Sequence, residues 1–379
     1  MLCGFSRMRI QCCIDGKLFS SLPPLSPISL PSPKEIHLWY VIPSEVKGES
    51  LMNKYMEILS PCEIEKVWSF RRDELRKSAL LARALVRTTI ARYQINSSVT
   101  PKSIKFRKNV HGKPEVDWPC SYNWEPPALH FNITHTSSLI ACGVTINSPI
   151  GVDVEEKERT TKHNILTLAR RYFSKHELEV LTAIGDPYIQ QQEFIKLWTL
   201  KEAYVKALGK GFSGAPFKTF TIRLGSSVGE HFHLSQNSSA EASEIVVDSL
   251  DNTENLTSNW QFMLLEFASS HYVAICTEKD VKTKGDCNNN PMKLTVWKTI
   301  PFVEDSCVSG TDTVLKIVEV QEFSLFCIPV CKMASFLPDC CVQLGPEDLM
   351  KTELHNVATG FKIRRAYMTV FHLYNELHC

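Results

Sequence analysis

The stretch EFIKLWTLKEAYVKALGKGF, residues Glu193–Phe212, has the periodicity of a single amphipathic helix. Glu202 and Lys206 lie four residues apart on one face, so their side chains emerge together. Gly209 and Gly211 predict the end of the helix. Taken alone, this segment indicates an ordinary core helix with a surface Glu–Lys pair. The neighbouring stripe is apolar apart from one lysine; its members are Phe194, Trp198, Lys201, Val205 and Leu208.

A second segment, IGVDVE at Ile150–Glu155, changes that interpretation. Its apolar run is interrupted by acids at alternate positions, which predicts a strand with Asp153 and Glu155 on one face. Two carboxylates on one face repel each other unless a cation lies between them or both are well solvated. Together with Glu202, they make a set of three oxygen ligands that suits Mg²⁺.

The sequence GVDVE followed by WTLKEAYVK resembles the paired signature of the Sfp-type 4'-phosphopantetheinyl transferases of the holo-acyl-carrier-protein synthase superfamily. The resemblance covers residues 36–280 and is to plant-like members; the C-terminal extension of this chain is atypical for the family. It implies an α+β fold of two similar α/β halves related by pseudo-twofold symmetry. It also implies Mg²⁺-dependent transfer of the 4'-phosphopantetheine arm of coenzyme A to a serine of an apo carrier protein, with release of 3',5'-ADP.

The same resemblance implies roles for individual residues. Asp153, Glu155 and Glu202 become the metal ligands, and Glu202 also becomes the candidate base for the serine hydroxyl. Lys206 is expected to contact the phosphates and to stabilise the leaving charge. Lys201 is a second candidate for that contact, although its place on the apolar stripe predicts that its stem is packed.

Coenzyme A is expected to bind three further segments. Arg72 matches an arginine at the start of a family helix. The stretch FNITH, which contains Asn132, Thr134 and His135, is similar to a family segment whose histidine lies against the 3'-phosphate, and a phosphate favours a charged histidine. A glycine turn with flanking lysines is expected to hold the nucleotide end; its members are Lys108, His111, Gly112, Lys113 and Pro114.

Composition limits the alternatives. A net charge of +1 gives no case for nucleic-acid binding, and no apolar run is long enough for a membrane span. The 14 cysteines show no zinc-site pattern, and we expect reduced thiols in a reducing, cytoplasmic compartment. The two halves meet within one chain, so a monomer is expected.

Four ranges are predicted. Residues 1–34 are typical of a leader, either a mitochondrial or plastid transit peptide or a disordered segment. Residues 35–148 and 149–280 form the two halves, and the second carries the metal site. Residues 281–379 lack clear periodicity beyond one strand-like run, which favours a poorly folded extension over an accessory domain.

Local patterns predict most elements within the halves. Strands are expected at 35–42 and 137–144, a largely helical segment at 61–93, and a strand–turn–strand at 103–116. Ser174 and Glu177 match a helix capping box. Residues 182–192 are expected to be irregular, and 237–255 to form a long mobile loop.

Two other functions remain open at this stage. A Mg²⁺-dependent hydrolase of nucleoside diphosphate compounds needs only the acids. A non-catalytic module that binds coenzyme A or a carrier protein needs only the basic turn and His135. The sequence does not choose among fatty-acid carriers, polyketide-type carriers and a reductase of lysine metabolism as the protein that is modified.

Overall fold

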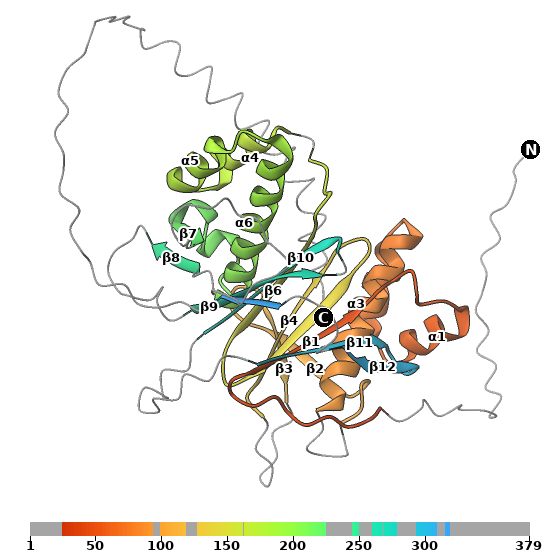
Figure 1. The fold of residues 1–379 in the computed structure, drawn as a ribbon. Helices are drawn as coiled ribbons and strands as arrows, with labels where there is room; N and C mark the ends of the chain where they lie inside the picture. The colour runs from red at the N-terminus through yellow and green to blue at the C-terminus, as the bar shows by residue number, and fades with distance from the viewer. Residues whose placement is uncertain are drawn as a thin grey trace, which may run out of the picture.

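The computed structural model describes residues 25–93, 99–118, 127–161, 163–224, 245–249, 260–267, 269–278, 293–308 and 315–318. Two sheets lie at the centre of the molecule; α6 packs on one and α3 on the other, while α4 and α5 lie at the far end of α6 (Figure 1). A core of apolar side chains from both sheets fills the space between them. Within the described residues, no helix is long and apolar enough to cross a membrane.

The first half runs from a central strand through three helices to two hairpins. The last helix of the three, α3, packs its long apolar face on the sheet and buries most of its residues. The elements are β1 (Glu35–Val41), α1 (Glu49–Glu57), α2 (Pro61–Ser69), α3 (Asp73–Arg92), β2 (Lys105–Lys108), β3 (Pro114–Asp117), β4 (Leu129–His135) and β5 (Ile140–Ile146).

The second half repeats this order. Its long helix, α6, covers the outer face of the second sheet just as α3 covers that of the first. The elements are β6 (Ile150–Glu156), α4 (Ile165–Tyr172), α5 (Lys175–Ala183), α6 (Pro187–Leu208), the short helices α7 (Gly211–Gly214) and η1 (Phe217–Thr219), then β7 (Phe220–Leu224), β8 (Ile245–Ser249), β9 (Trp260–Phe267) and β10 (His271–Glu278).

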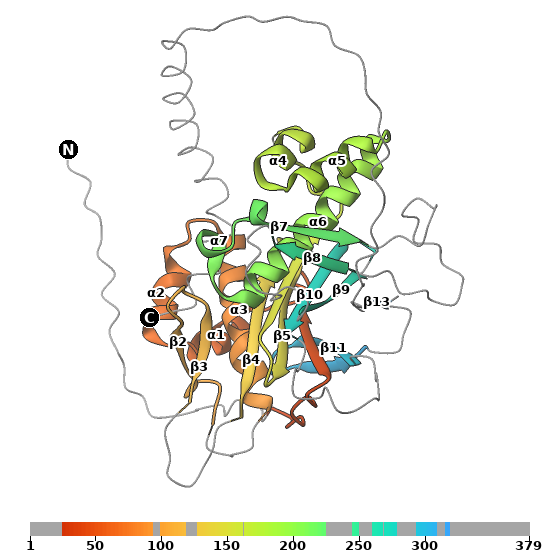
Figure 2. The same ribbon diagram turned by 90° about the vertical axis from the view of Figure 1, so that its left-hand side faces the viewer.

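Strand pairing repeats as well. In each half the first strand pairs antiparallel with the last, and the last pairs with the strand before it, which gives the orders β1-β5-β4 and β6-β10-β9. The view in Figure 2 shows both sets of strands side by side. This repetition confirms the predicted α+β fold of two similar halves.

The two sheets meet where β4 runs beside β6. Each is an edge strand of its own sheet, so its outer backbone groups need partners from elsewhere. Asn132 Oδ1 accepts a hydrogen bond from the Val152 amide at 2.8 Å, and Thr134 Oγ1 accepts one from the Val154 amide at 3.3 Å. Side chains of the first half therefore satisfy the edge of the second and fix the position of β6.

Residues of the predicted extension take part in both sheets. Strand β11 (Lys293–Ile300) runs parallel to β1, β12 (Glu304–Cys307) pairs with β11, and β13 (Leu315–Val318) pairs with β9. The Trp297 ring stacks on Trp39 with centroids 5.1 Å apart. A poorly folded extension is therefore wrong for residues 293–308 and 315–318; the rest of 281–379 lies outside the described residues.

Side-chain caps set the helix starts. Ser60 and Glu63 form a capping box on α2, and Ser174 and Glu177 form the predicted one on α5. Helix α6 begins at Pro187 rather than at Glu193, because the Asp186 carboxylate accepts from the amides of residues 188 and 189 and proline suits the first helical turn. The predicted irregular stretch 182–192 is thus wrong over its second half.

Two other local predictions are corrected. Strand β8 occupies residues 245–249 within the predicted loop 237–255, whose other residues lie outside the described ranges. Cys62 is disulfide-bonded, which contradicts reduced thiols at that position, whereas Cys142 and Cys276 are buried free thiols. Of the predicted leader, residues 25–34 are described, and Leu25 is among those packed against the first core.

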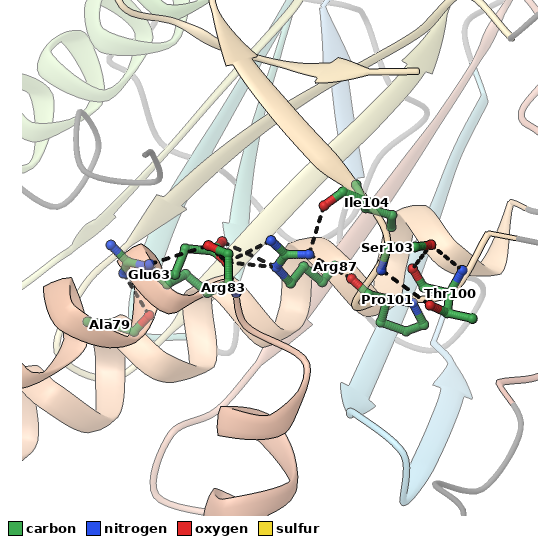
Figure 3. Close-up of polar contacts among 9 residues, drawn as sticks. Glu63, Ala79, Arg83, Arg87, Thr100, Pro101, Ser103 and Ile104 are labelled. Carbon is green, nitrogen blue, oxygen red and sulfur yellow. Dashed lines mark hydrogen bonds and ion pairs between the residues drawn. The ribbon is translucent and has the colours of Figure 1, made fainter. Parts of the chain in front are cut away.

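A buried ion pair joins α2 to α3 (Figure 3). Arg87 Nη2 lies 2.6 Å from Glu63 Oε2, and its Nη1 donates to the carbonyls of Pro101 and Ile104 at 2.7 and 2.9 Å. Glu63 also accepts from the Ser60 amide at 2.8 Å. The guanidinium therefore holds the capping box, the long helix and the start of the β2–β3 hairpin together.

Candidate active site

Strand β6 separates its side chains onto two faces. Ile150, Val152 and Val154 point into the core between the sheets. Gly151 lies on the opposite face against α6, where a Cβ atom would meet the Ala203 carbonyl oxygen at 2.0 Å. Only glycine allows the helix this close approach. The alternation brings Asp153 and Glu155 to the same face as Gly151, toward the helix.

The close approach of α6 brings Glu202 and Lys206 over β6. Lys206 Nζ lies 2.5 Å from Asp153 Oδ1 and 3.2 Å from the Val152 carbonyl oxygen. Asp153, Glu155, Glu202 and Lys206 line one pocket, which His135 also borders. The structure thus brings together the three predicted metal ligands, the predicted phosphate-contacting lysine and the predicted 3'-phosphate histidine.

Burial dominates the electrostatics of the three acids. It raises the pKa of Asp153, against the opposing effect of the Lys206 ammonium. It raises the pKa of Glu155 to about 7, with Arg159 opposing the shift. Burial also raises the pKa of Glu202 well above its ordinary value, and the nearby Asp153 adds to the effect. Three crowded carboxylates in this setting favour a bound cation.

The three carboxylates are the kind of ligand that a divalent ion prefers, but their positions in the described structure do not form a metal site. Asp153 Oδ2 is buried and has no hydrogen-bond partner in the described part of the chain, and three carboxylates suit Mg²⁺. However, no group of three His, Cys, Asp or Glu side chains among the described residues is arranged closely enough to hold a metal ion. Lys206 contacts Asp153, and Arg159 forms an ion pair with Glu155, so two cations neutralise two of the acids.

The segment around His135 contributes both structure and charge. Asn132 and Thr134 connect to β6, and Thr134 Oγ1 also donates to Asp153 Oδ1 at 3.2 Å, which orients that carboxylate. Burial, then the charges of Lys206 and Arg83, lower the pKa of His135 to about 4. The imidazole is therefore neutral at pH 7 in the free protein, and the expected charged form would require an anion beside it.

The predicted nucleotide-binding turn docks on the second half. Lys113 Nζ donates to the carbonyls of Ile150 and Ala207 at 2.8 and 3.2 Å, and burial lowers the pKa of Lys113 to about 8. Asn109 shapes the turn, since its Oδ1 accepts from the amides of 111 and 113 while its Nδ2 donates to the Gly209 carbonyl at 3.1 Å. The turn joins the halves at the end of α6.

Seven residues predicted to bind coenzyme A do not line the pocket formed by the described residues. Arg72 occupies the N-cap position at the exposed start of α3, without a side-chain cap hydrogen bond. The contact of these residues with the coenzyme stays a prediction. The seven are Arg72, Lys108, His111, Gly112, Lys113, Pro114 and Asn132.

Lys201 does not face the pocket, so its expected phosphate contact is wrong. Its ammonium is fully buried, 2.9 Å from Glu177 Oε1, and donates to the carbonyls of Phe217 and Phe220 at 2.8 and 2.7 Å. It also lies 4.1 Å from the centroid of the Phe220 ring. The lysine on the apolar stripe is a structural cation.

Two family models match the chain over the regions that form the two halves. A model described as "4'-phosphopantetheinyl transferase superfamily" matches residues 149–276, and one described as "4'-phosphopantetheinyl transferase, N-terminal" matches residues 48–145. The 4'-phosphopantetheinyl transferase Sfp of Bacillus subtilis is 36% identical over 45% of this chain and 69% of its own length. This chain belongs to the 4'-phosphopantetheinyl transferase family.

Other relatives agree with this assignment. The 4'-phosphopantetheinyl transferase HetI of Nostoc is 31% identical over 47% of this chain and 70% of its own length. A solved holo-[acyl-carrier-protein] synthase of Thermotoga maritima is similar over 35% of this chain and 63% of its own, with 19% identity and a TM-score of 0.24. That score is too low to support an argument, so the family assignment rests on the sequence matches.

Two residues that position or line this pocket were missed by the sequence reasoning. Gly151 stands within the IGVDVE motif. Its role is to let α6 pack closely against β6, and this role is visible only when α6 is in place. Arg159 lines the pocket and pairs with Glu155 four residues before it. The four-residue spacing was the available signal, but it is typical of ordinary surface pairs.

A hydroxyl-rich turn after His135 was also missed. Ser137 and Ser138 both donate to Glu156 Oε1 at 2.7 Å. Because the Ser138 hydroxyl proton is used there, His271 Nε2 at 2.9 Å must be the donor to Ser138, and His271 Nδ1 accepts from Ser270 at 2.8 Å. Residues of the second half therefore hold the turn that follows His135 in the first.

Proposed function

We propose that this chain transfers the 4'-phosphopantetheine arm of coenzyme A to a serine hydroxyl of an apo carrier protein, in a Mg²⁺-dependent reaction that releases 3',5'-ADP. The observation that carries the proposal is the position of Lys206 and Glu202 over Asp153 in one pocket. Such a combination of acids and a lysine suits transfer at a diphosphate, where positioning and charge stabilisation supply most of the catalysis.

Asp153, Glu155 and Glu202 would hold the Mg²⁺ ion. When bound, the ion neutralises negative charge on the diphosphate oxygens. The buried Asp153 Oδ2, which has no hydrogen-bond partner among the described residues, and the raised pKa values of all three acids support this assignment. Thr134, which donates to Asp153 Oδ1, would keep that carboxylate oriented toward the pocket.

Glu202 is the proposed base. Its pKa is raised by burial and by Asp153, so its carboxylate accepts a proton more readily than an ordinary one. The serine hydroxyl would transfer its proton to Glu202, directly or through a water molecule. Its oxygen would bond to the phosphorus that bears pantetheine as the bond from that phosphorus to the 3',5'-ADP oxygen breaks.

Lys206 and His135 would contact the two phosphate-bearing ends of the leaving nucleotide. Lys206 would stabilise the charge on the departing phosphate. His135 would contact the 3'-phosphate, which would raise its pKa from about 4 and lead to proton uptake on binding. Arg72 and the turn from Lys108 to Pro114 are proposed to contact the rest of the coenzyme.

Intact-mass analysis of an apo acyl carrier protein incubated with this protein, coenzyme A and Mg²⁺ tests the proposal. A mass gain equal to the phosphopantetheine arm, lost with EDTA and in Asp153→Asn, is expected. Nucleotide release without a carrier protein would instead identify a diphosphate hydrolase. Coenzyme binding with no product on several carriers would identify a non-catalytic module.

Three further assignments remain proposals. We propose a monomer, because both halves of the site come from one chain, and sedimentation measures this directly. We propose a cytoplasmic location, with residues 1–34 as a leader whose targeting is tested by a fluorescent fusion. The boundaries at 35, 149 and 281 are proposed as the limits of the leader, the two halves and the extension.

A further inference from the structure

The pocket is short of positive charge for a ligand with a diphosphate. Among the described lining residues, the permanently cationic side chains are Lys206 and Arg159, which face the carboxylates of Asp153, Glu155, Glu156 and Glu202. His135 is neutral at pH 7, and the lysine of the nucleotide turn, Lys113, binds backbone carbonyls instead. An anionic ligand in this pocket must therefore be met by the two lining cations and by any bound metal ion.

Arg159 has the geometry of a built site residue. It follows β6 by a short turn, in which its amide donates to the Glu156 carbonyl at 3.1 Å. Gln191 Nε2 of α6 donates to its carbonyl at 3.1 Å, so the backbone is anchored to both sides of the pocket. Its guanidinium pairs with Glu155 and lies 6.0 Å from the centroid of the Trp198 ring.

The exposure of the pair indicates which partner a ligand would meet. The Arg159 side chain is 30% exposed and that of Glu155 is 13% exposed. A guanidinium carries five N–H donors in a planar fork, a shape that matches phosphate oxygens as well as carboxylates. Lys206 likewise forms an ion pair with Asp153, and its side chain is the more exposed of the two. Arg159 and Lys206 therefore each neutralise a carboxylate that is also a proposed metal ligand.

We propose that Arg159 is a binding residue for the diphosphate of coenzyme A, and that it exchanges Glu155 for this ligand when Mg²⁺ takes the carboxylate. The proposal rests on the proposed function and adds a residue to it. In the free protein Arg159 neutralises Glu155, and in the loaded protein it supplies a second cation beside Lys206. Mg²⁺ and Arg159 compete for Glu155, while Mg²⁺ and diphosphate binding support each other.

Calorimetry on the full chain tests this with Arg159→Ala and a matched control, Arg107→Ala. Arg107 also pairs with a glutamate, Glu115 at 3.2 Å, but lies outside the pocket. With Mg²⁺ present, we expect Arg159→Ala to weaken coenzyme A binding roughly tenfold or more, as for a lost charge-assisted hydrogen bond. Dephospho-coenzyme A, which keeps the diphosphate, should lose the same factor, and Arg159→Lys should lose less.

A second titration separates the two roles of the residue. Mg²⁺ alone, without coenzyme, should bind Arg159→Ala more tightly than wild type, because a competing cation is gone. Unchanged coenzyme affinity in Arg159→Ala, with wild-type binding intact, would overturn the diphosphate assignment. A loss for coenzyme A but not for dephospho-coenzyme A would also overturn it in favour of the 3'-phosphate. If wild type with Mg²⁺ binds neither coenzyme, the proposed function itself fails.

Discussion

The two halves use the same buried ion pair in equivalent places. In each, the glutamate of a capping box pairs with a cation on the long helix, Glu63 with Arg87 and Glu177 with Lys201, at the same separation along the chain. Each cation also donates to two backbone carbonyls just before the next hairpin. The repeat that is faint in the sequence is therefore preserved in its buried polar contacts.

The halves differ one helical turn further on. Lys206 of α6 contacts Asp153 on β6, whereas Arg92, at the equivalent place on α3, lies over the Trp39 ring on β1 at 5.0 Å. Strand β1 is interior to its sheet, between β11 and β5, and β6 is an edge strand. One scaffold therefore has a face closed by Trp39 and the Arg92–Asp305 ion pair in one half, and an acid-lined pocket in the other.

The largest effect should come from the acids that distinguish the second half. Asp153→Asn and Glu202→Gln are each expected to lower transfer by roughly a hundredfold or more, because each removes a charge at the reacting diphosphate. Thr88→Ala is the control, because Thr88 occupies on α3 the place that Glu202 occupies on α6. The Thr88 hydroxyl donates to carbonyls of α3 itself. Rates of carrier modification near wild type in either acid variant would contradict the comparison.

Gly151→Ala should break the close approach of α6. The added Cβ would meet backbone atoms at 2.0 and 2.3 Å, so the helix must shift away from Asp153. We expect loss of most transfer activity and destabilisation by about 1–3 kcal/mol, measured by urea unfolding. Gly185→Ala, where nothing lies within 4 Å of the added atom, should change neither quantity.

The Glu63–Arg87 and Glu177–Lys201 ion pairs should contribute similarly to the free energy of unfolding. Glu63→Gln and Glu177→Gln each leave a buried cation without its counterion, at a cost of about 3–5 kcal/mol in the free energy of unfolding. The double replacement Glu177→Gln with Lys201→Met should cost less than the single change. If one single variant unfolds at the same urea concentration as wild type, the two pairs are not equivalent.

His135 should give the smallest effect, seen in the dependence of stability on pH. Its pKa is about 4 in the folded protein, lowered from 6.5 by burial and by two neighbouring cations. Between these values the unfolded chain binds the proton and the folded one does not, so stability falls as pH falls through this window. Urea unfolding at several pH values should show a shallower fall in His135→Gln; an identical pH profile would contradict this.

Much of the site was predictable because its acids lie in short local patterns. Alternation in IGVDVE and the spacing of Glu202 and Lys206 specify which side chains share a face. What could not be predicted depends on contacts between distant segments. Lys113 also donates to the carbonyls of Ile150 and Ala207, a contact between the halves that its local sequence does not reveal. The edge-to-edge meeting of β4 and β6 leaves no periodic signal.

The fold, like the site, was predictable where it depends on local patterns and not where it depends on contacts between distant segments. Caps and apolar periodicity identified most helices and strands within the halves. The role of β11 was missed because a strand-like run does not reveal its partner, and the partner of β11 is near the other end of the chain. Lys201 was placed with the phosphate ligands because its buried partner, Glu177, lies on another helix.

The pairing of β1 with β11 has a consequence for biosynthesis. Glu35 is in register with Lys293, and Arg92 Nη2 lies 2.7 Å from Asp305 Oδ1, so β1 leaves the ribosome long before the strand with which it pairs. The helices α4–α6 and strands β6–β10 are all synthesised in between. Contacts this remote in sequence carry a large loop-closure cost and form slowly. Until they form, the aromatic side of the nascent first sheet stays open to water and to chaperones.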